Sequence, residues 1–581
     1  MFVLIRSIRS YLKTRLSLTD LTGGFNLSIR KWIFRDEKND PLITGKLSRE
    51  LDCGNILSSV LQARGIKTSD EAKAFLYSSD EEHDPYLLPD LELALNRIKI
   101  ARTKGETVCV YGDYDADGVT ATVIMMSTFE KMGMKVFRYL PDRKEDGYSL
   151  NKKAIDIIHK NGATLIVTVD CGISCREEIS YAGLLGIDVI VTDHHNCPET
   201  IPECVAVINP KRADSRYPFG HLSGAGVAYK LATVLIGDEA KPLLEFAAIG
   251  TVADVVSLTG ENRSIVRGGL EIINNSPSPG IAALLVSASK SRDVSSETVA
   301  FILAPRINSA GRMKNANIAY DLLAEKDLTR ANELAEKLNS LNRERQTEEQ
   351  KIFAEAVEII KKDSLFDDDV IVVGNDNWSV GVIGIVASKI TEAANKPSMV
   401  ISYDGETGKC SGRSIAGFDL YDALKDSKGT LVSFGGHSLA AGAVIEKEKE
   451  EAFRKAINSY AKKNLTDEDR IRKIYIDTKI EPSDITVRNI EKLSLLEPTG
   501  AENAKPVVAF INAKIREMRL LSEGKHLKLT VEKDGFYLDA IKFNVGSADK
   551  KLYTGKSVHL AGSIGINDYN GRPQLIIKDI L

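Results

Sequence analysis

The stretch that decides the fold is V-C-V-Y-G-D-Y-D-A-D-G, residues 108–118. Its first four residues are mostly apolar and predict a buried strand, a glycine ends that strand, and residues 119–133 have the spacing of a helix. Between strand and helix, Asp113, Asp115 and Asp117 stand at alternate positions. This order places the three carboxylates beyond the C-terminal end of a strand, where open α/β sheets bind their ligands.

These three carboxylates are close enough in sequence to repel one another. A divalent cation with oxygen ligands would offset that repulsion. A solvated acidic turn explains the same residues without a metal, because acidic loops are common. The loop alone therefore leaves both interpretations open.

Length and composition limit the class of protein. A chain of 581 residues is too long for one core, so we expect three or four domains. No apolar run approaches the ~18 residues that cross a bilayer, so we expect no membrane association. A net charge of −4 excludes a generally basic surface, so any nucleic-acid site has to be a local patch. Seven dispersed cysteines without a CxxC pair predict reduced thiols in the cytoplasm.

The order of strands and helices predicts the domain organisation. Apolar segments at 108–111, 135–139, 164–169 and 188–192 alternate with helical ones, which is typical of a parallel sheet covered by helices on both faces. Residues 222–273 are mainly helical, with interruptions expected at Gly224, Gly226 and Gly250, and residues 327–362 form one long helix or a broken pair. A second strand–helix series starts at residue 370, and short alternating segments after residue 472 predict a small barrel.

From this pattern we expect five parts. They are an N-terminal extension (1–45), a catalytic α/β domain (46–325), a connecting helix (326–364), a smaller α/β domain (365–465) and a barrel domain (470–581). Residues 1–19 carry four basic residues and no acidic one, a composition similar to that of an organellar transit peptide. We favour a short basic helix, or an extension from an upstream start codon.

Two further strands end in residues that bind metals. Asp170 follows the strand at 164–169, and Asp193, His194 and His195 follow the strand at 188–192. The chain has only eight histidines, so two adjacent ones after a carboxylate at a strand end point to a site. Together with Asp254 they give a carboxylate and imidazole set that suits Mn²⁺ or Mg²⁺ better than structural zinc. Two such ions, bridged by one carboxylate, would clamp a phosphate and activate water for in-line attack.

Four motifs in this order resemble the signature of the DHH phosphoesterases, and among them the RecJ family of single-strand-specific 5′→3′ exonucleases. They are D-Y-D-A-D-G (113–118), D-C-G (170–172), D-H-H (193–195) and G-G-H-S-L-A-A-G (435–442). The resemblance covers about residues 30–581. It implies an α/β fold with a parallel-sheet DHH domain, a long helical connector, a smaller α/β DHH-associated domain and a C-terminal OB-fold β-barrel. It also implies degradation of single-stranded DNA to 5′-mononucleotides, in recombination and repair.

The resemblance implies two Mn²⁺ or Mg²⁺ ions and suggests their ligands. Asp115 and Asp117 would each hold one ion, and Asp170 would bridge the two. His194 and Asp254 would complete the second site.

The resemblance also suggests residues that act on the substrate. Asp113 would orient water or a ligand, and His195 would face the scissile phosphate. Arg306, Asn308 and Arg312 would form a loop that grips the substrate backbone, since a guanidinium matches phosphate geometry. The residues that would hold the nucleotide end in the smaller domain are Arg413, Ser414, Gly435, Gly436 and His437.

The barrel would bind single strands by stacking bases on aromatic side chains beside basic ones. The candidates are Phe536, Tyr537, Phe543 and Tyr569 for the bases, and Lys525, Lys528, Lys542 and Arg572 for the backbone. The expected partners are single-stranded DNA, a helicase and a single-strand-binding protein, and we expect a monomer.

Two alternative functions stay open at this point. A short-oligonucleotide or cyclic-dinucleotide phosphodiesterase of the DHH superfamily would prefer very short substrates and usually lacks the terminal barrel. A replication scaffold would bind single-stranded DNA without cutting it and would have lost metal ligands, whereas every expected ligand is present here.

Overall fold

The computed structural model describes residues 30–77, 82–142, 149–290, 293–522, 524–545 and 549–581. The basic segment 1–19 lies outside these residues. The described chain divides into two compact units, one with residues 77–345 and 496–504, the other with residues 30–76, 346–495 and 505–581. Among the described helices we find none with both the length and the apolar character needed to cross a bilayer.

The first unit contains an all-parallel sheet with the strand order β3-β2-β4-β5-β6. The strands are β2 (Thr107–Tyr111), β3 (Lys135–Tyr139), β4 (Ala163–Val169), β5 (Asp188–Thr192) and β6 (Ala206–Ile208). The sequence predicts the first four, because they are long and apolar enough to show a pattern. It misses β6, since three residues are too few to carry one.

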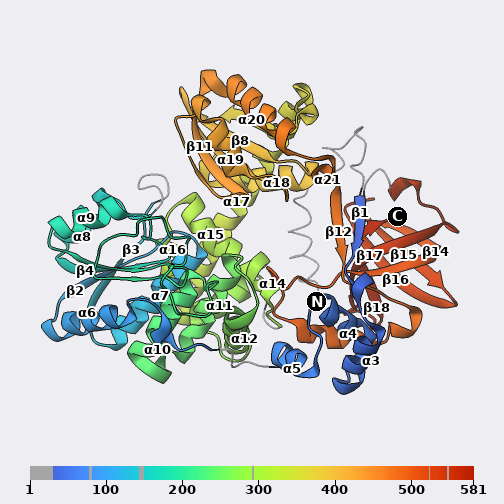
Figure 1. Cartoon of the computed structure of the whole chain (residues 1–581), viewed down its shortest axis with the longest axis horizontal. Helices are drawn as coiled ribbons and strands as arrows, with labels where there is room; N and C mark the ends of the chain where they lie inside the picture. Colours follow the sequence, from blue (N-terminus) through green and yellow to red (C-terminus); the bar gives the residue numbers. More distant parts are fainter. Residues whose placement is uncertain (1–29, 78–81, 143–148, 291–292, 523, 546–548) are drawn as a thin grey trace. The chain divides into compact units, whose positions relative to one another are not determined.

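Helices cover both faces of this sheet (Figure 1). One face packs against α6 (Leu91–Lys104), α7 (Ala116–Lys131) and α10 (Gly224–Ile236), and the other against α8 (Lys152–Lys160) and α9 (Arg176–Leu184). The remaining helices of this unit are α11 (Leu244–Ala253), α12 (Gly260–Asn275), α13 (Pro279–Ser287), α14 (Ser296–Thr298), α15 (Ala304–Met313) and α16 (Asn317–Leu323). Burial on both faces explains why the strands are apolar throughout.

Helix boundaries correct the sequence prediction near the acidic stretch. Helix α7 starts at Ala116, three residues earlier than expected, because the Asp115 carboxylate accepts hydrogen bonds from the N–H groups of Asp117 and Gly118. Asp117 therefore lies in the first turn of a helix and not in a loop. The glycines expected to interrupt the later helices do not: Gly224 begins α10, and Gly250 lies within α11. The predicted connector is one unbroken helix, α17 (Leu328–Lys362).

The second unit contains a smaller mixed sheet with the order β10-β11-β9-β8-β7. Its strands are β7 (Ile371–Asp376), β8 (Ser398–Asp404), β9 (Thr407–Arg413), β10 (Ser433–Gly436) and β11 (Ala440–Glu446). Its helices are α18 (Val380–Ala394), α19 (Leu420–Asp426), α20 (Glu450–Asn464) and α21 (Asp467–Arg470).

The second unit also contains the predicted barrel. Strands β14 (Val508–Leu521), β15 (His526–Lys533), β16 (Phe536–Phe543), β18 (Pro573–Ile580) and β17 (Ser557–Ile566) pair in this order, and β17 pairs back with β14 to close the ring. Strand β13 (Thr478–Lys479) adds to β14. The parallel-sheet domain, the smaller α/β domain and the closed barrel together confirm the predicted fold class.

The N-terminal part of the described chain belongs to this second unit. Strand β1 (Arg30–Phe34) pairs in parallel with β12 (Arg472–Ile476), although the sequence prediction assigns it to the extension. Helices α3 (Pro41–Glu50), α4 (Gly54–Ala63) and α5 (Ser69–Tyr77) follow, and α4 packs against α22 (Val487–Glu491). We therefore propose that the extension ends before Arg30 and that residues 30–76 belong to the second unit, in place of the predicted boundary at residue 46. The boundaries predicted near residues 325, 365 and 465 stay predictions.

Candidate metal centre and substrate contacts

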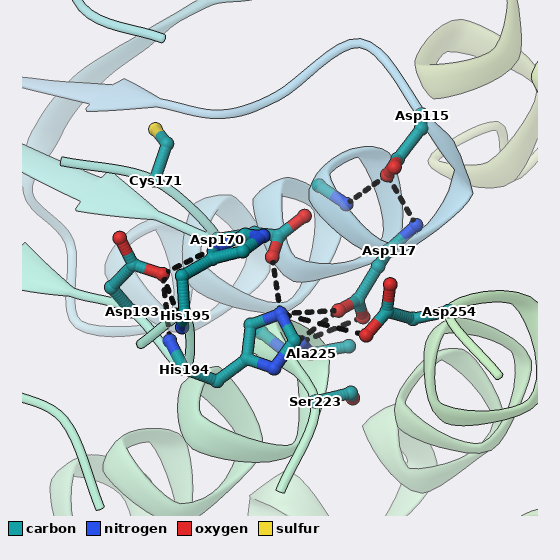
Figure 2. A network of polar contacts seen from close by, with 12 residues as sticks. Asp115, Asp117, Asp170, Cys171, Asp193, His194, His195, Ser223, Ala225 and Asp254 are labelled. Atoms are coloured by element: carbon teal, nitrogen blue, oxygen red, sulfur yellow. Dashed lines mark hydrogen bonds and ion pairs between the residues drawn. The ribbon is translucent and has the colours of Figure 1, made fainter. Parts of the chain in front are cut away.

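Carboxylates and imidazoles from separate elements meet at the carboxyl edge of the parallel sheet (Figure 2). They come from the end of β2, the first turn of α7, the ends of β4 and β5, and the C-terminus of α11. The residues are Asp113, Asp115, Asp117, Asp170, His194, His195 and Asp254. All five predicted metal ligands, together with Asp113 and His195, therefore lie at one edge.

His194 is at the centre of this cluster. Its Nε2 lies 3.1 Å from Oδ1 of Asp170, 3.5 Å from Oδ2 of Asp254 and 3.9 Å from Oδ2 of Asp117 (Figure 2). These residues come from four different elements, so only the folded chain brings them together.

The donor atoms form overlapping groups. Ligand atoms of Asp117, His194 and Asp254 lie within 4.8 Å of one another. The same holds for Asp113, Asp115 and Asp170, and for Asp170, His194 and His195. The arrangement could hold two ions. Asp170 belongs to two of the three groups, one with Asp113 and Asp115 and one with the two histidines.

Backbone amides fix the Asp117 carboxylate. Its Oδ2 accepts a hydrogen bond of 2.7 Å from the N–H of Gly224, and its Oδ1 accepts one of 2.9 Å from Ala225, both at the N-terminus of α10. A Cβ at Gly250 would lie 2.4 Å from Oδ1 of Asp117 and 2.6 Å from the Cβ of Ala225. Glycine at position 250 is therefore required for α11 to pack this closely against α7 and α10.

Asp170 is held in an uncommon backbone conformation. Its φ of +60° lies in the left-handed region, which Asp and Asn adopt more readily than most residues. Its N–H donates to the carbonyl of Thr192, 3.0 Å away. A Cβ at Gly224 would lie 2.4 Å from the Cβ of Asp170, so the N-terminus of α10 approaches this carboxylate as well.

The cluster is unfavourable without a cation. Burial, followed by repulsion from neighbouring carboxylates, raises the pKa of Asp117 to about 7 and of Asp254 to about 8, and raises the pKa of Asp170 well above its usual range. Burial lowers the pKa of His194 to about 3, which keeps its imidazole neutral and able to bind a metal.

Unpaired atoms show where a cation fits. Oδ1 of Asp170 and both ring nitrogens of His194 are buried, with no hydrogen-bond partner among the described residues. Buried polar atoms are normally paired, so these atoms need a further partner. Carboxylate oxygens with one neutral imidazole suit Mn²⁺ or Mg²⁺.

His195 differs from His194 in its charge. Its Nδ1 lies 2.7 Å from Oδ1 of Asp193, which also accepts hydrogen bonds from the N–H groups of both histidines. Burial alone would lower the pKa of His195, but the contact with Asp193 raises it to about 9. Asp193 was predicted only as one of the candidate metal-binding residues, whereas the structure shows that its carboxylate orients the ring of His195.

Arg306, Asn308 and Arg312 lie on helix α15, whereas the prediction placed them in a loop. Asn308 Oδ1 accepts a 2.8 Å hydrogen bond from the N–H of Ala116, so this side chain supports the start of α7. A Cβ at Gly311 would lie 2.4 Å from the carbonyl oxygen of Tyr114, which shows how closely α15 packs against the acidic segment. A helix replaces the loop because the segment packs along its length against other elements of this unit.

Arg306 is partly buried beside other cations. Its Nη1 donates to the carbonyl of Ile302, and its Nε has no hydrogen-bond partner among the described residues. Burial, with repulsion from Arg343 and Arg345, lowers its pKa to about 10. A bound anion would accept a hydrogen bond from this Nε and would offset the repulsion from Arg343 and Arg345.

The predicted residues of the smaller domain lie around the β10–β11 hairpin. Arg413 ends β9 and pairs with Ala440, and the N–H of Ser414 donates to the carbonyl of Leu439. Gly435 and Gly436 end β10, and the N–H of His437 donates to the carbonyl of Ala440, 2.8 Å away. The structure thus brings these five residues together within the second unit.

The aromatic candidates of the barrel fall into two groups. Tyr537 and Tyr569 are 61% and 65% exposed. Phe536 and Phe543 are partly buried: Phe536 packs against the barrel core, and the ring of Phe543 contacts His526, so both have packing partners within the barrel. Among the basic candidates, Lys528 and Lys542 form ion pairs with Asp539 and Asp549.

Comparisons with known proteins give consistent matches along the chain. The DHH family N-terminal domain matches residues 107–251, the DHHA1 domain residues 367–463, and the RecJ OB domain residues 476–579. The single-stranded-DNA-specific exonuclease RecJ of Bacillus subtilis is 39% identical over 540 residues, which cover 92% of this chain and 69% of that protein. RecJ of Escherichia coli is 33% identical over 556 residues, 90% of this chain and 95% of that one.

Solved structures agree with these sequence matches. The crystal structure of RecJ from Thermus thermophilus in complex with Mn²⁺ superposes with a TM-score of 0.82 at 28% identity, covering 95% of this chain and 79% of that one. The structure of the same protein with Mg²⁺ gives a TM-score of 0.75 at 27% identity, covering 95% and 78%.

Proposed function

Because this chain belongs to the RecJ family of single-stranded-DNA-specific exonucleases, we propose that it hydrolyses single-stranded DNA in a reaction that depends on Mn²⁺ or Mg²⁺. The observation that carries this proposal is the buried cluster at the sheet edge. There, Oδ1 of Asp170 and both ring nitrogens of His194 lack a hydrogen-bond partner among the described residues. At neutral and higher pH, bound cations would stabilise such a cluster by offsetting the repulsion between its carboxylates.

We assign one ion to the group that contains Asp113, Asp115 and Asp170 and the other to Asp117, His194 and Asp254, and we propose that Asp170, whose Oδ1 lies 3.1 Å from Nε2 of His194, is shared by the two ions. Asp113 and Asp115 would hold one ion, which gives Asp113 a direct contact with metal in place of a supporting role. The second ion would be held by Asp117, His194 and Asp254. Ions bound there neutralise phosphate charge and lower the pKa of water.

The other side chains act on the phosphate. His195, whose pKa is raised to about 9, carries a positive charge at neutral pH and would stabilise the negative charge that develops on the scissile phosphate. The unpaired Nε of Arg306 would bind a neighbouring phosphate oxygen. Asn308 would keep the acidic segment in place through the N–H of Ala116.

The remaining features of the proposal come from the family resemblance. They are digestion from the 5′ end, release of 5′-mononucleotides, and capture of the nucleotide end by Arg413, Ser414, Gly435, Gly436 and His437. A helicase that supplies single strands and a single-strand-binding protein are proposed partners, and a monomer in the cytoplasm is the proposed state. The exposed tyrosines of the barrel, Tyr537 and Tyr569, support binding of single strands there.

Timed digestion of single strands tests the proposal. DNA and RNA strands labelled at the 5′ or the 3′ end are incubated with Mn²⁺, Mg²⁺ or EDTA, together with a series of substrate lengths. We expect early loss of the 5′ label from DNA, only with a metal. A preference for two- or three-nucleotide substrates would favour the short-oligonucleotide phosphodiesterase, and binding without any cleavage would favour the scaffold.

A further inference from the structure

Residues 496–504 belong to the first unit, although the chain on either side belongs to the second. The guanidinium of Arg263, on α12, donates hydrogen bonds to the carbonyls of Leu496, Glu497 and Pro498 at 2.9, 2.9 and 3.1 Å. Ser296 Oγ donates to the carbonyl of Thr499 at 2.6 Å. Arg263 and Ser296 are both buried, so this segment is firmly fixed to the first unit.

The chain that leaves the metal centre is strained. Asp254 ends α11, and the next residue, Val255, has a φ of +60°. A β-branched residue is rarely found in this left-handed conformation, because its side chain clashes with the backbone there. Val255 is also 70% exposed, so its own side chain adds little packing to hold it there. Within the turn, the N–H of Val255 donates to the carbonyl of Val252 at 3.3 Å. Further contacts come from the residues that follow.

Segment 496–504 supplies those contacts. Ser257 Oγ donates a 2.7 Å hydrogen bond to Oε2 of Glu502, and the N–H of Leu258 donates a 2.9 Å bond to the carbonyl of Ala501. A Cβ at Gly500 would lie 2.5 Å from Cδ1 of Leu258, so the two segments are in close contact. Glu502 itself has a φ of +56°, a conformation that glycine would adopt at lower cost. Glu502, whose side chain accepts the hydrogen bond from Ser257, therefore stands at a position whose backbone conformation favours glycine.

We propose that Glu502 is a positioning residue for the metal centre, because its carboxylate holds Ser257 and thereby fixes the strained turn that presents Asp254. This inference rests on the proposed role of Asp254 as a metal ligand. Loss of the Glu502 carboxylate would let the turn relax at Val255, and the Asp254 carboxylate would then move relative to His194. Metal affinity, more than protein stability, is expected to report the change.

The variant Glu502→Gly separates an effect on metal affinity from an effect on protein stability. Glycine suits a φ of +56°, so the variant removes the carboxylate without adding backbone strain. Mn²⁺ binding to the full-length protein is measured by electron paramagnetic resonance of the free ion, beside thermal unfolding in EDTA. We expect Mn²⁺ affinity to fall about three- to tenfold. This loss is at or below the lower end of that seen when a residue that supports a metal ligand is removed. Unfolding in EDTA is expected to change little.

Matched variants complete the experiment. Glu502→Gln keeps an oxygen that accepts from Ser257 and should restore most of the affinity. Ser257→Ala should lose as much as Glu502→Gly, and the double variant no more than either alone. Mn²⁺ affinity that stays at the level of the unmodified protein in Glu502→Gly, or a further loss in the double variant, would overturn the inference.

Asp254→Asn serves as the reference for the metal centre and should lose considerably more affinity. If it lowers Mn²⁺ affinity while Glu502→Gly does not, the positioning role is wrong and the proposed function stands. If Asp254→Asn itself leaves Mn²⁺ binding unchanged, the proposed ligand set is wrong and the inference falls with it.

Discussion

Oδ1 of Asp170 lies 3.1 Å from Nε2 of His194, and neither atom has a hydrogen-bond partner among the described residues. At this distance a hydrogen bond requires a proton on one of the two groups and correct alignment. Burial and neighbouring carboxylates raise the pKa of Asp170, while burial lowers the pKa of His194. A cation that accepts an electron pair from each atom would satisfy both.

Asp170→Asn is therefore expected to abolish cleavage without damaging the fold. Asn tolerates the φ of +60° at this position better than Ala does, so the backbone should remain in place. Loss of the shared ligand should slow cleavage about 10³-fold or more, since bound cations contribute several kcal/mol to such reactions. Single-turnover cleavage of labelled single-stranded DNA measures this loss, and thermal unfolding in EDTA should be unchanged or higher. Activity within tenfold of the unmodified protein at saturating Mn²⁺ would contradict the bridging role.

Removal of metal is expected to destabilise the protein more at high pH than at low pH. The pKa values of Asp117 and Asp254 are raised from near 3.8 to about 7 and about 8, so the folded state binds more protons than the unfolded state between these values. Without metal, the ionisation of these two carboxylates should lower stability as pH rises from about 4 to about 8. With metal, the ionised carboxylates are neutralised, and the fall should be smaller.

Thermal unfolding at pH 5.5 and pH 8, in EDTA and in Mg²⁺, measures this effect. The difference in Tm between Mg²⁺ and EDTA should be larger at pH 8, and Asp254→Asn should reduce that difference. An equal difference at both pH values would show that these carboxylates do not titrate as their burial requires.

Most of the site residues that could be predicted from the sequence lie just after the end of a strand. Asp170 and His194 each follow a run of apolar residues, and the carboxyl ends of parallel strands share one edge, so their convergence follows from the pattern alone. Asp254 was harder to place, because it ends a helix and no strand pattern leads to it. Its residue type placed it in the candidate metal-binding set, and only the family resemblance gave it a position as a ligand of the second ion.

Contacts between distant segments could not be predicted in the same way. Asn308 bonds to Ala116 across 192 residues, and nothing in the local sequence of either residue indicates that contact. The start of α7 was predicted three residues late, because an Asp at position 115 fits a metal ligand as well as a helix cap, and the local sequence does not distinguish the two. The structure shows that the Asp115 side chain accepts the capping hydrogen bonds and also faces the cluster.

Asp193→Asn is expected to shift the pH dependence of cleavage. His195 should be protonated in the active enzyme, and the contact with Asp193 raises its pKa to about 9. Cations bound beside His195 would lower this pKa, so activity should fall on the alkaline side at or below that value. A neutral Asn keeps the acceptor oxygen but not the charge, so the fall should move about one to two pH units lower.

The measurement is kcat/KM in Mg²⁺ between pH 6 and pH 9.5, with His195→Gln as the control. This control should have low activity and no alkaline fall within that range. An alkaline fall at the same pH in Asp193→Asn and in the unmodified protein would rule out the assigned role of His195.

Two glycines within helices should respond in opposite ways to the same substitution. In Gly250→Ala, the new Cβ would collide with Oδ1 of Asp117 and with the Cβ of Ala225, so we expect a loss of about 1–3 kcal/mol in stability and weaker metal binding. In Gly183→Ala, on α9, the new Cβ meets no atom within 4 Å, and we expect a gain of up to about 1 kcal/mol. Urea unfolding measures both. Equal effects of the two substitutions would contradict the close approach of α11 to Asp117.

Exposed tyrosines on the barrel are expected to contribute to DNA affinity. Tyr537 and Tyr569 are 61% and 65% exposed, so their rings are available to stack on bases, whereas Phe536 packs against the core. Tyr537→Ala and Tyr569→Ala should each weaken binding of a single-stranded oligonucleotide by about 1–3 kcal/mol without lowering Tm.

Fluorescence anisotropy in EDTA at one fixed salt concentration measures the affinity, since phosphate contacts vary with salt. Tyr86→Ala, an exposed tyrosine of the first unit, is the control and should bind normally. Normal binding by both barrel variants would show that the strand does not stack on these tyrosines.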